Sequence, residues 1–153
     1  MSSKHSLSVA ERARAEALRE ELETDGVRFA IAGYADLHGN LKGKMVPIGH
    51  FADMAGGSEL FTGAALDGLP QDISDEELSA RPDLARGVVL PHRPDVALFL
   101  SDLYVGGVPF EAAARNILDI TADDYAHVAR AAHKIAAAAM KAAIASSHFC
   151  WRE

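Results

Sequence analysis

The sequence is poor in cysteine, in long apolar runs and in positive charge. Its one cysteine, Cys150, allows no disulfide within the chain and fits a reducing compartment. No apolar run reaches transmembrane length, and the first residues lack the hydrophobic segment of a secretory signal. The 15 Lys and Arg are outnumbered by 22 Asp and Glu, which gives a net charge of -7. We therefore expect a cytoplasmic protein with no nucleic-acid partner and no membrane partner.

Motifs that identify a catalytic centre are also absent. There is no phosphate-binding G-x-x-x-x-G-K-[ST], no G-x-G-x-x-G after a strand, no H-E-x-x-H and no paired C-x-x-C. The seven histidines are scattered, and His127 and His133 are six residues apart, off the i, i+4 spacing that places two metal ligands on one helix face. From these patterns we predict no metal site in this chain.

The strongest pattern that is present covers residues 27–48. Residues 27–37 alternate with period 2, which predicts a strand whose apolar face includes Val27, Phe29 and Ile31. The short connection 38–40 and the return segment 41–48 complete a β-hairpin. Because an isolated hairpin is marginally stable in water, other elements must pack on it.

Further elements are predicted on both sides of this hairpin. Ser8 and Glu11 have the spacing of a capping box, which predicts a surface helix over residues 9–23. The continuous apolar run at residues 96–100 predicts a central strand, extending to Tyr104 and covered on both faces. We expect at most two helical turns at 49–54, a short strand at 88–90, helix at 111–118 and otherwise no regular element longer than a few residues between 61 and 95.

The last third of the chain is rich in alanine. Thr121 and Asp124 can start a helix that runs to about residue 146, because alanine has high helix propensity, although it offers little area to bury. The sequence as a whole predicts an α+β fold in which the hairpin and the strand at 96–104 share one sheet with flanking helices.

Two segments are candidates for function. The acids Asp72, Asp75, Glu76 and Glu77 can hold a cation or accept a proton, but Ser74 and Glu77 also have capping-box spacing, and that structural interpretation is the commoner one. The segment F-T-G-A-A-L-D-G-L at residues 61–69 suits either close approach to a ligand or a surface loop. Lys42 and Lys44 can attract an anion or protect a sheet edge from aggregation, and edge protection is more common.

The order of four motifs adds a resemblance. These are D-x-x-G-x-x-K-G-K-x-V-P at residues 36–47, the 61–69 segment, acids followed by R-P-D at 81–83, and R-P-D-V-A-L-F-L-S-D at 93–102. Over residues 27–118 the chain resembles the amino-terminal, β-grasp-like domain of glutamine synthetases, most closely the type III enzymes of rhizobia.

The resemblance implies ATP-dependent ligation of ammonia to L-glutamate, with Mg²⁺ or Mn²⁺, in a homo-oligomeric ring. In that family the amino-terminal domain closes an active site whose ATP and metal ligands belong to the carboxy-terminal domain of the neighbouring subunit. This chain does not contain those ligands, so we predict that it is inactive in isolation.

The resemblance also implies roles for particular residues. The family loop F-D-G-S-S-x-x-G corresponds to residues 61–69, with its ammonium-binding aspartate replaced by Thr62, beside Gly63; Asp67 can substitute for it. A second family acid corresponds to Glu77, or to Asp75 if the loop length differs. The family arginine at the domain junction corresponds to Arg115, although its usual D-P-R context reads A-A-R here.

The resemblance divides the chain into a lead-in at 1–26, the synthetase-like domain at 27–118 and an alanine-rich tail at 119–153. The tail is either a truncated or frame-shifted reading of a longer gene or the oligomerisation helix of a short protein. Two alternative functions remain open: a non-catalytic module that assembles with full-length synthetase, and a ligase that joins methylamine to glutamate, for which the uncharged Thr62 is suited.

Overall fold

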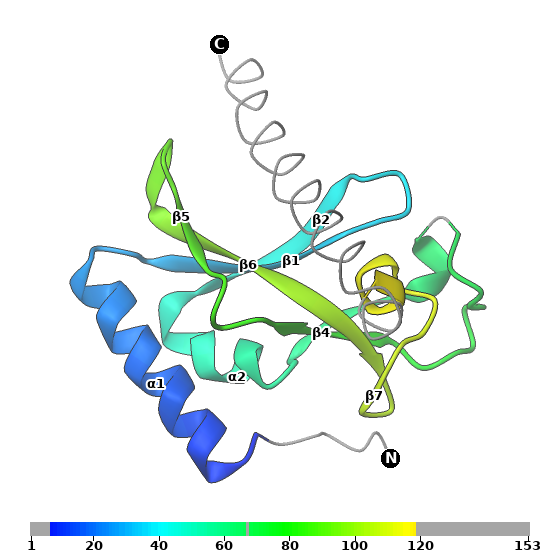
Figure 1. The fold of residues 1–153 in the computed structure, drawn as a ribbon, viewed down its shortest axis with the longest axis horizontal. Coiled ribbons are helices and arrows are strands. Elements are labelled where there is room, and N and C mark those ends of the chain that lie inside the picture. Colours follow the sequence, from blue (N-terminus) through cyan, green and yellow to red (C-terminus); the bar gives the residue numbers. More distant parts are fainter. Residues whose placement is uncertain (1–6, 67, 119–153) are drawn as a thin grey trace.

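Strand β6 (Arg93–Val105) runs through the centre of the sheet in the computed structural model, which describes residues 7–66 and 68–118 (Figure 1). The predicted hairpin is confirmed, since β1 (Phe29–Ala35) pairs antiparallel with β2 (Leu41–Pro47). β1 also pairs with β6, in parallel, with Phe29 opposite Val96 and Gly33 opposite Leu100. The predicted central strand is therefore confirmed as well.

Short strands pair along the remaining edges of β6. On the edge opposite β1, β4 (Leu78–Pro82) pairs with the second half of β6 and β5 (Val88–Leu90) with the first half. The strand β3 (Glu59–Phe61) adds to β4, and β7 (Val108–Pro109) folds back on the end of β6. The result is a seven-stranded sheet in the order β2-β1-β6-β4-β3, with β5 and β7 also paired to β6.

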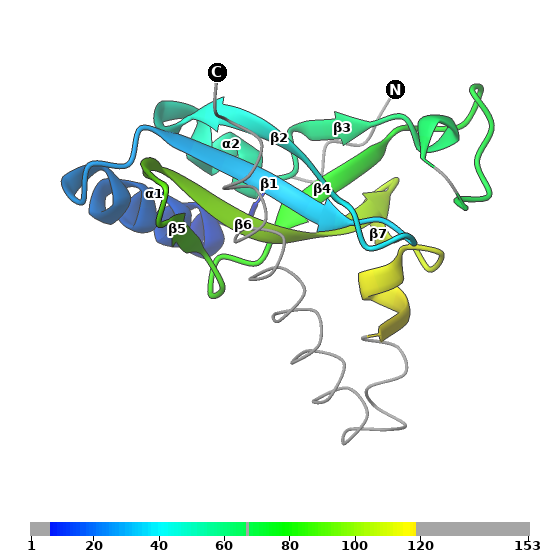
Figure 2. The ribbon, with the colours of Figure 1, turned by 90° about the horizontal axis from the view of Figure 1, so that it is seen from above.

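Few helices accompany the sheet. α1 (Val9–Thr24) begins with the predicted capping box, in which Ser8 and Glu11 satisfy each other's backbone N–H groups. A 3-10 turn, η1 (Ile48–His50), leads into α2 (Phe51–Ala55), and a second turn, η2 (Gly63–Ala65), lies in the candidate loop. Of the expected helix at 111–118, residues 114–118 are helical and 111–113 form a turn. The views in Figures 1 and 2 place α1 and α2 on the same side of the sheet.

Both faces of the sheet carry apolar clusters. The larger one joins the sheet to α1 and α2 and includes Phe51, Met54 and Phe99, with the two phenyl rings 5.1 Å apart. The smaller one, on the opposite face, contains Leu90, Val96 and Leu98. Close packing on both faces explains why β6 reads as a continuous apolar run rather than an alternating one.

The prediction for the apolar face of β1 needs correction. Phe29 and Ile31 are only partly buried and pack against the smaller cluster. The alternate residues Ala30, Ala32 and Tyr34 are the buried ones, and they belong to the main core. Alanines score as weakly apolar in a sequence pattern, but their small size allows the helical layer to approach the sheet closely.

Two expectations for residues 61–95 are also wrong. The five-residue strand β4 was not expected, because five residues give little periodicity and β4 ends in proline. Ser74 caps no helix: residues 73–75 form a turn and Leu78 begins a strand. The expected short strand at 88–90 is confirmed.

The mixed α+β class is confirmed by these elements. The predicted alanine-rich helix, with the tail at 119–153, lies outside the described residues. No helix within residues 7–66 and 68–118 combines the length and apolar character needed to cross a bilayer.

The main core predicts the effect of one substitution. Phe99 is 1% exposed and contacts Phe51, so Phe99→Ala leaves a cavity and should lower the free energy of unfolding by about 3–5 kcal/mol. Val108→Ala is the control, because Val108 is 66% exposed and should change stability by less than about 0.5 kcal/mol. Urea unfolding followed by circular dichroism measures both, and equal effects would contradict the assigned core.

Candidate functional site

The pairing of β3 with β4 brings two of the predicted site residues together. Phe61, the last residue of β3, lies opposite Leu78, the first of β4, so Thr62 just after β3 meets Glu77 just before β4. The Thr62 hydroxyl donates to Glu77 Oε1 at 3.4 Å, across fifteen positions of sequence. Both side chains are exposed. A hydroxyl and a carboxylate therefore stand side by side at the mouth of the 61–69 loop.

The other acids of the cluster serve the turn that precedes Glu77. The Asp75 side chain accepts from the Asp72 N–H at 2.7 Å, and Asp72 accepts from the Ile73 N–H at 2.6 Å. These bonds satisfy backbone donors in a turn without a helix. Of the two alternatives for the second acid, Glu77 contacts Thr62, whereas Asp75 is engaged within its own turn.

Gly63, within the 61–69 loop, packs tightly against Gln71. A Cβ atom at Gly63 would lie 1.6 Å from Gln71 Oε1, a distance that no substitution could keep without moving the glutamine. Gln71 in turn donates through Nε2 to the Glu76 carbonyl oxygen at 3.2 Å. Gly63 and Gln71 thus connect the two segments that carry Thr62 and Glu77. Asp67, the other predicted loop residue, lies outside the described residues.

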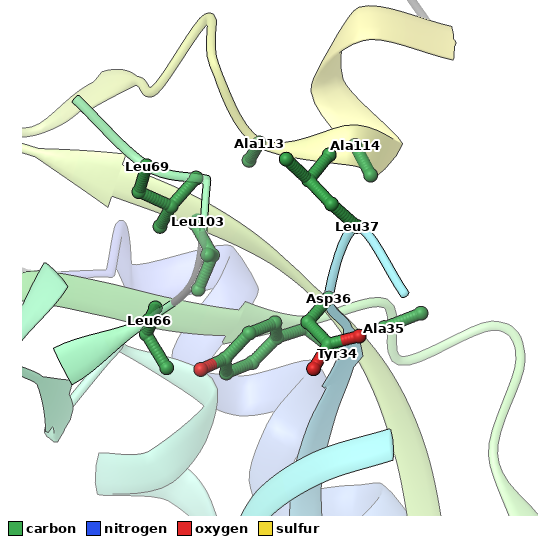
Figure 3. Close-up of a pocket in the computed structure, with 9 residues that line it drawn as sticks. All are labelled: Tyr34, Ala35, Asp36, Leu37, Leu66, Leu69, Leu103, Ala113 and Ala114. Carbon is green, nitrogen blue, oxygen red and sulfur yellow. The ribbon is translucent and has the colours of Figure 1, made fainter. Parts of the chain in front are cut away.

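The far end of the loop rests on the tip of the hairpin. Gly68 adopts a φ of +80°, and a Cβ atom there would lie 2.2 Å from Leu37 Cδ1. Glycine is needed at this position both for the backbone conformation and for the close approach. Leu37, Leu66 and Leu69 line a small cavity of about 10 Å³ with Tyr34 (Figure 3). That volume is too small for a substrate, so these side chains serve to pack the 61–69 loop against the tip of the hairpin.

The near end of the loop is held by aromatic and cationic contacts. The Tyr34 ring meets the Phe61 ring edge to face, with centroids 5.0 Å apart. Lys44 of β2 donates to the Leu60 carbonyl oxygen and lies 5.2 Å from the Phe61 ring centroid. The interpretation of Lys44 as edge protection is therefore incomplete, because its ammonium group also links β2 to β3.

Two ionisable groups near the hairpin tip have shifted pKa values. Burial, reinforced by the charge of Asp36, raises the pKa of Tyr34 to about 12. Burial also opposes ionisation of Asp36, but hydrogen bonds from the Asn40 and His38 N–H groups outweigh it and lower the pKa of Asp36. Asp36 is thus a structural acid that fixes the connection 36–40 between β1 and β2.

Arg115 is engaged away from the Thr62–Glu77 pair. Its Nε donates to Asp102 Oδ1 of β6, and its Nη2 lies 3.4 Å from Asp83 Oδ2. The neighbouring Asn116 is buried and donates to the carbonyl oxygens of Leu103 and Phe110. Together they fix the start of the helical residues 114–118 against the end of β6.

The described acidic side chains do not form a metal cluster. Across residues 7–66 and 68–118, no three His, Cys, Asp or Glu side chains are grouped as a metal ion requires. ATP and Mg²⁺ or Mn²⁺ are implied only by the resemblance, in which their ligands belong to the carboxy-terminal domain.

Several contacts that shape the site were not predicted from the sequence. These are the Tyr34–Phe61 pair, the Lys44–Leu60 bond, the packing of Gln71 on Gly63 and of Leu37 on Gly68. The period-2 pattern puts Tyr34 on the face of Ala30 and Ala32, which is the only signal that Tyr34 points inward. The remaining contacts depend on strand register.

Comparison with known proteins shows likeness to glutamine synthetases over part of the chain. The glutamine synthetase of Rhizobium meliloti (strain 1021) is 35% identical over 95 residues, which is 61% of this chain and 21% of the relative. That of Methanococcus maripaludis is 32% identical over 112 residues, 65% of this chain and 24% of the relative. No protein-family model matches the sequence.

Solved structures give the same result. A GmaS/ADP complex matches with a TM-score of 0.67 and 30% identity, covering 71% of this chain and 25% of that one. GmaS without ligand matches with a TM-score of 0.63 and 31% identity, covering 67% and 24%. The chain is thus a homologue of glutamine synthetases over part of its length, and it spans at most about a quarter of these relatives.

The hairpin tip predicts a pH-dependent contribution to stability. Because the folded-state pKa of Asp36 is lowered, its carboxylate stabilises the fold above the unfolded pKa near ~3.9, and this is lost as pH falls through the folded value. Asp36→Asn should therefore cost about 1–2 kcal/mol at pH 7 and progressively less as the pH falls below ~3.9. Urea unfolding of both proteins across this range measures it; a difference independent of pH would contradict it.

Proposed function

We propose that this chain corresponds to the amino-terminal, β-grasp-like domain of a type III glutamine synthetase, residues 27–118, and that it closes the active site of a neighbouring subunit. The Thr62–Glu77 hydrogen bond carries this proposal, because it joins the two segments in which the family places its amine-binding acids. The likeness to glutamine synthetases supports a ligase by family resemblance.

The chemistry of the pair suits a cationic amine. Glu77 uses Oε1 to accept from Thr62, which leaves Oε2 able to accept from an ammonium group and to take its proton. Thr62 contributes a neutral acceptor beside this charge. Glu77 therefore performs the role for which the family uses two acids, and Asp75 does not, since its carboxylate is bound within the turn.

Arg115 supports the same arrangement as a junction residue. Its pairing with Asp83 and Asp102 connects β6, the segment after β4 and the helical residues 114–118. The partners of such an assembly are L-glutamate, ammonia and further subunits of a ring, as the family implies.

Two narrower alternatives belong to this proposal. Ligation of methylamine instead of ammonia is favoured by the neighbours named GmaS, γ-glutamylmethylamide synthetase, and by the neutral Thr62, which leaves one charge fewer for ammonium. A non-catalytic module that assembles with full-length synthetase is the second alternative. This alternative predicts that the chain binds to a ring of full-length synthetase and that substitution of Glu77 does not change turnover.

The first test uses the chain itself. The purified 153-residue protein, supplied with glutamate, ATP, Mg²⁺ and either ammonia or methylamine, should release no phosphate above background, because its described residues group no metal ligands. Turnover by the chain alone would contradict the proposed dependence on a neighbouring catalytic domain.

The second test grafts residues 27–118 in place of the matching segment of the Rhizobium meliloti glutamine synthetase. In the active chimera, Glu77→Gln should lower kcat/KM for the amine by about 10²-fold, since general acid–base and charge interactions of this kind contribute ~10²–10⁴. Asp75→Asn is the matched control and should change it by less than about threefold. Comparing ammonia with methylamine in the same chimera identifies the amine.

Equal effects of the two substitutions would assign the acidic cluster to folding rather than catalysis. Unchanged turnover in the Glu77→Gln chimera, together with normal ring assembly, would favour the assembly module instead.

A further inference from the structure

A second concave region lies away from the Thr62–Glu77 pair. It is a groove of about 390 Å³ between the first turns of α1, the end of α2 and the ends of β4 and β6. Its lining includes Arg14, Arg81, Leu84, Asp102 and Tyr104. It shares none of its lining residues with the small cavity at the hairpin tip. Unlike that cavity, it is large enough for a small molecule.

Arg81 is held rigidly in this groove. Its guanidinium carbon lies 4.0 Å from the centroid of the Tyr104 ring, a stacking distance. Its side chain also rests on Gly57, where a Cβ atom would come within 3.1 Å of Arg81 Cγ. Gly57, at a φ of +87°, therefore makes room for the arginine. Stacking fixes the plane of a guanidinium and leaves its in-plane donors able to bind a planar oxyanion.

Those donors have no acceptor within the described part of the chain. Arg81 Nε is buried and makes no hydrogen bond, and neither Arg81 nor Arg14 has a carboxylate partner among residues 7–66 and 68–118. Buried donors in folded proteins nearly always have partners, so an unbonded N–H beside an open groove indicates a place for a ligand.

The acids that line the groove are already engaged. Asp102 accepts from Arg115, and Asp83 pairs with Arg115 at 3.4 Å and with Arg86 at 3.3 Å. Glu11 accepts from the N–H and the hydroxyl of Ser8 at the start of α1. Among the described residues, therefore, none of these carboxylates forms an ion pair with Arg14 or Arg81.

We propose that this groove binds a small molecule bearing a carboxylate or phosphate group, with Arg81 as the principal donor, Arg14 as a second charge and Leu7 and Leu84 against its apolar part. The site is separate from the ligase function proposed above and does not depend on it. Carboxylates and phosphates share the chemistry that a guanidinium recognises, a planar or tetrahedral group of anionic oxygens.

The test is calorimetric titration of the 153-residue chain with sodium phosphate and, separately, with sodium succinate at constant ionic strength. At least one probe should bind, and Arg81→Gln should weaken its binding about tenfold or more, with a smaller loss in Arg14→Gln. Arg12→Gln is the matched control, since Arg12 lies on the same helix but pairs with Asp53 at 3.4 Å outside the groove. The Arg12→Gln variant should bind the anion with the same affinity as the parent protein.

The Arg81→Lys variant tests whether the loss of binding in Arg81→Gln comes from misfolding. It keeps the charge while removing the fixed planar donors, so its affinity should be intermediate, and circular dichroism should show the parent's unfolding midpoint. Binding of phosphate alone or succinate alone identifies the anion, and binding of both supports the shared chemistry.

Three results would overturn the proposal: binding of neither probe, undiminished binding by Arg81→Gln, or an equal loss in Arg12→Gln, which would indicate bulk charge only. Because the readout is binding without turnover, failure of the ligase proposal leaves this result unaffected.

Discussion

The parallel pairing of β1 with β6 is the constraint on which the other contacts of this fold depend. It places the hairpin on one edge of β6 and leaves the opposite edge to β4 and β5. With Gly33 opposite Leu100, the tip of the hairpin extends toward the half of β6 that carries β4 and β3. A shift of this register by one residue would turn Tyr34 out of the core and move Leu37 away from Gly68.

The candidate loop therefore has two supports of different kinds. At its start, β-ladder hydrogen bonds between β3 and β4 set Thr62 against Glu77. At its end, the contact of Gly68 with Leu37 depends on packing alone. Of the described residues between these supports, Ala64 and Ala65 are exposed, Leu66 is partly buried and Gly63 is buried. Binding loops on rigid scaffolds usually have this arrangement, because the scaffold sets the geometry while the loop contacts the ligand.

The sequence predicted the elements whose signal is local. The capping box is a fixed spacing of Ser8 and Glu11, whereas the hairpin and the apolar strand extend a pattern over many residues, and each is present. β3 and β4 are too short to show periodicity and exist because β6 offers an edge to pair with. The resemblance identified Thr62 and Glu77 separately, but their contact depends on the pairing of Phe61 with Leu78, which no local pattern encodes. The groove at Arg81 was missed because its walls come from four distant elements.

The bond from Lys44 to the Leu60 carbonyl oxygen joins the two outermost strands of the sheet order, β2 and β3 (Figure 2). The two ends of the strand order are thus linked by a side chain as well as through the strands between them. A displacement of β3 beside the candidate loop is therefore transmitted to β2 through Lys44 as well as through β4, β6 and β1. Neutralising Lys44 would remove this link and leave every backbone pairing in place, so that the loop would be held to the hairpin by the Tyr34–Phe61 and Leu37–Gly68 packing contacts alone.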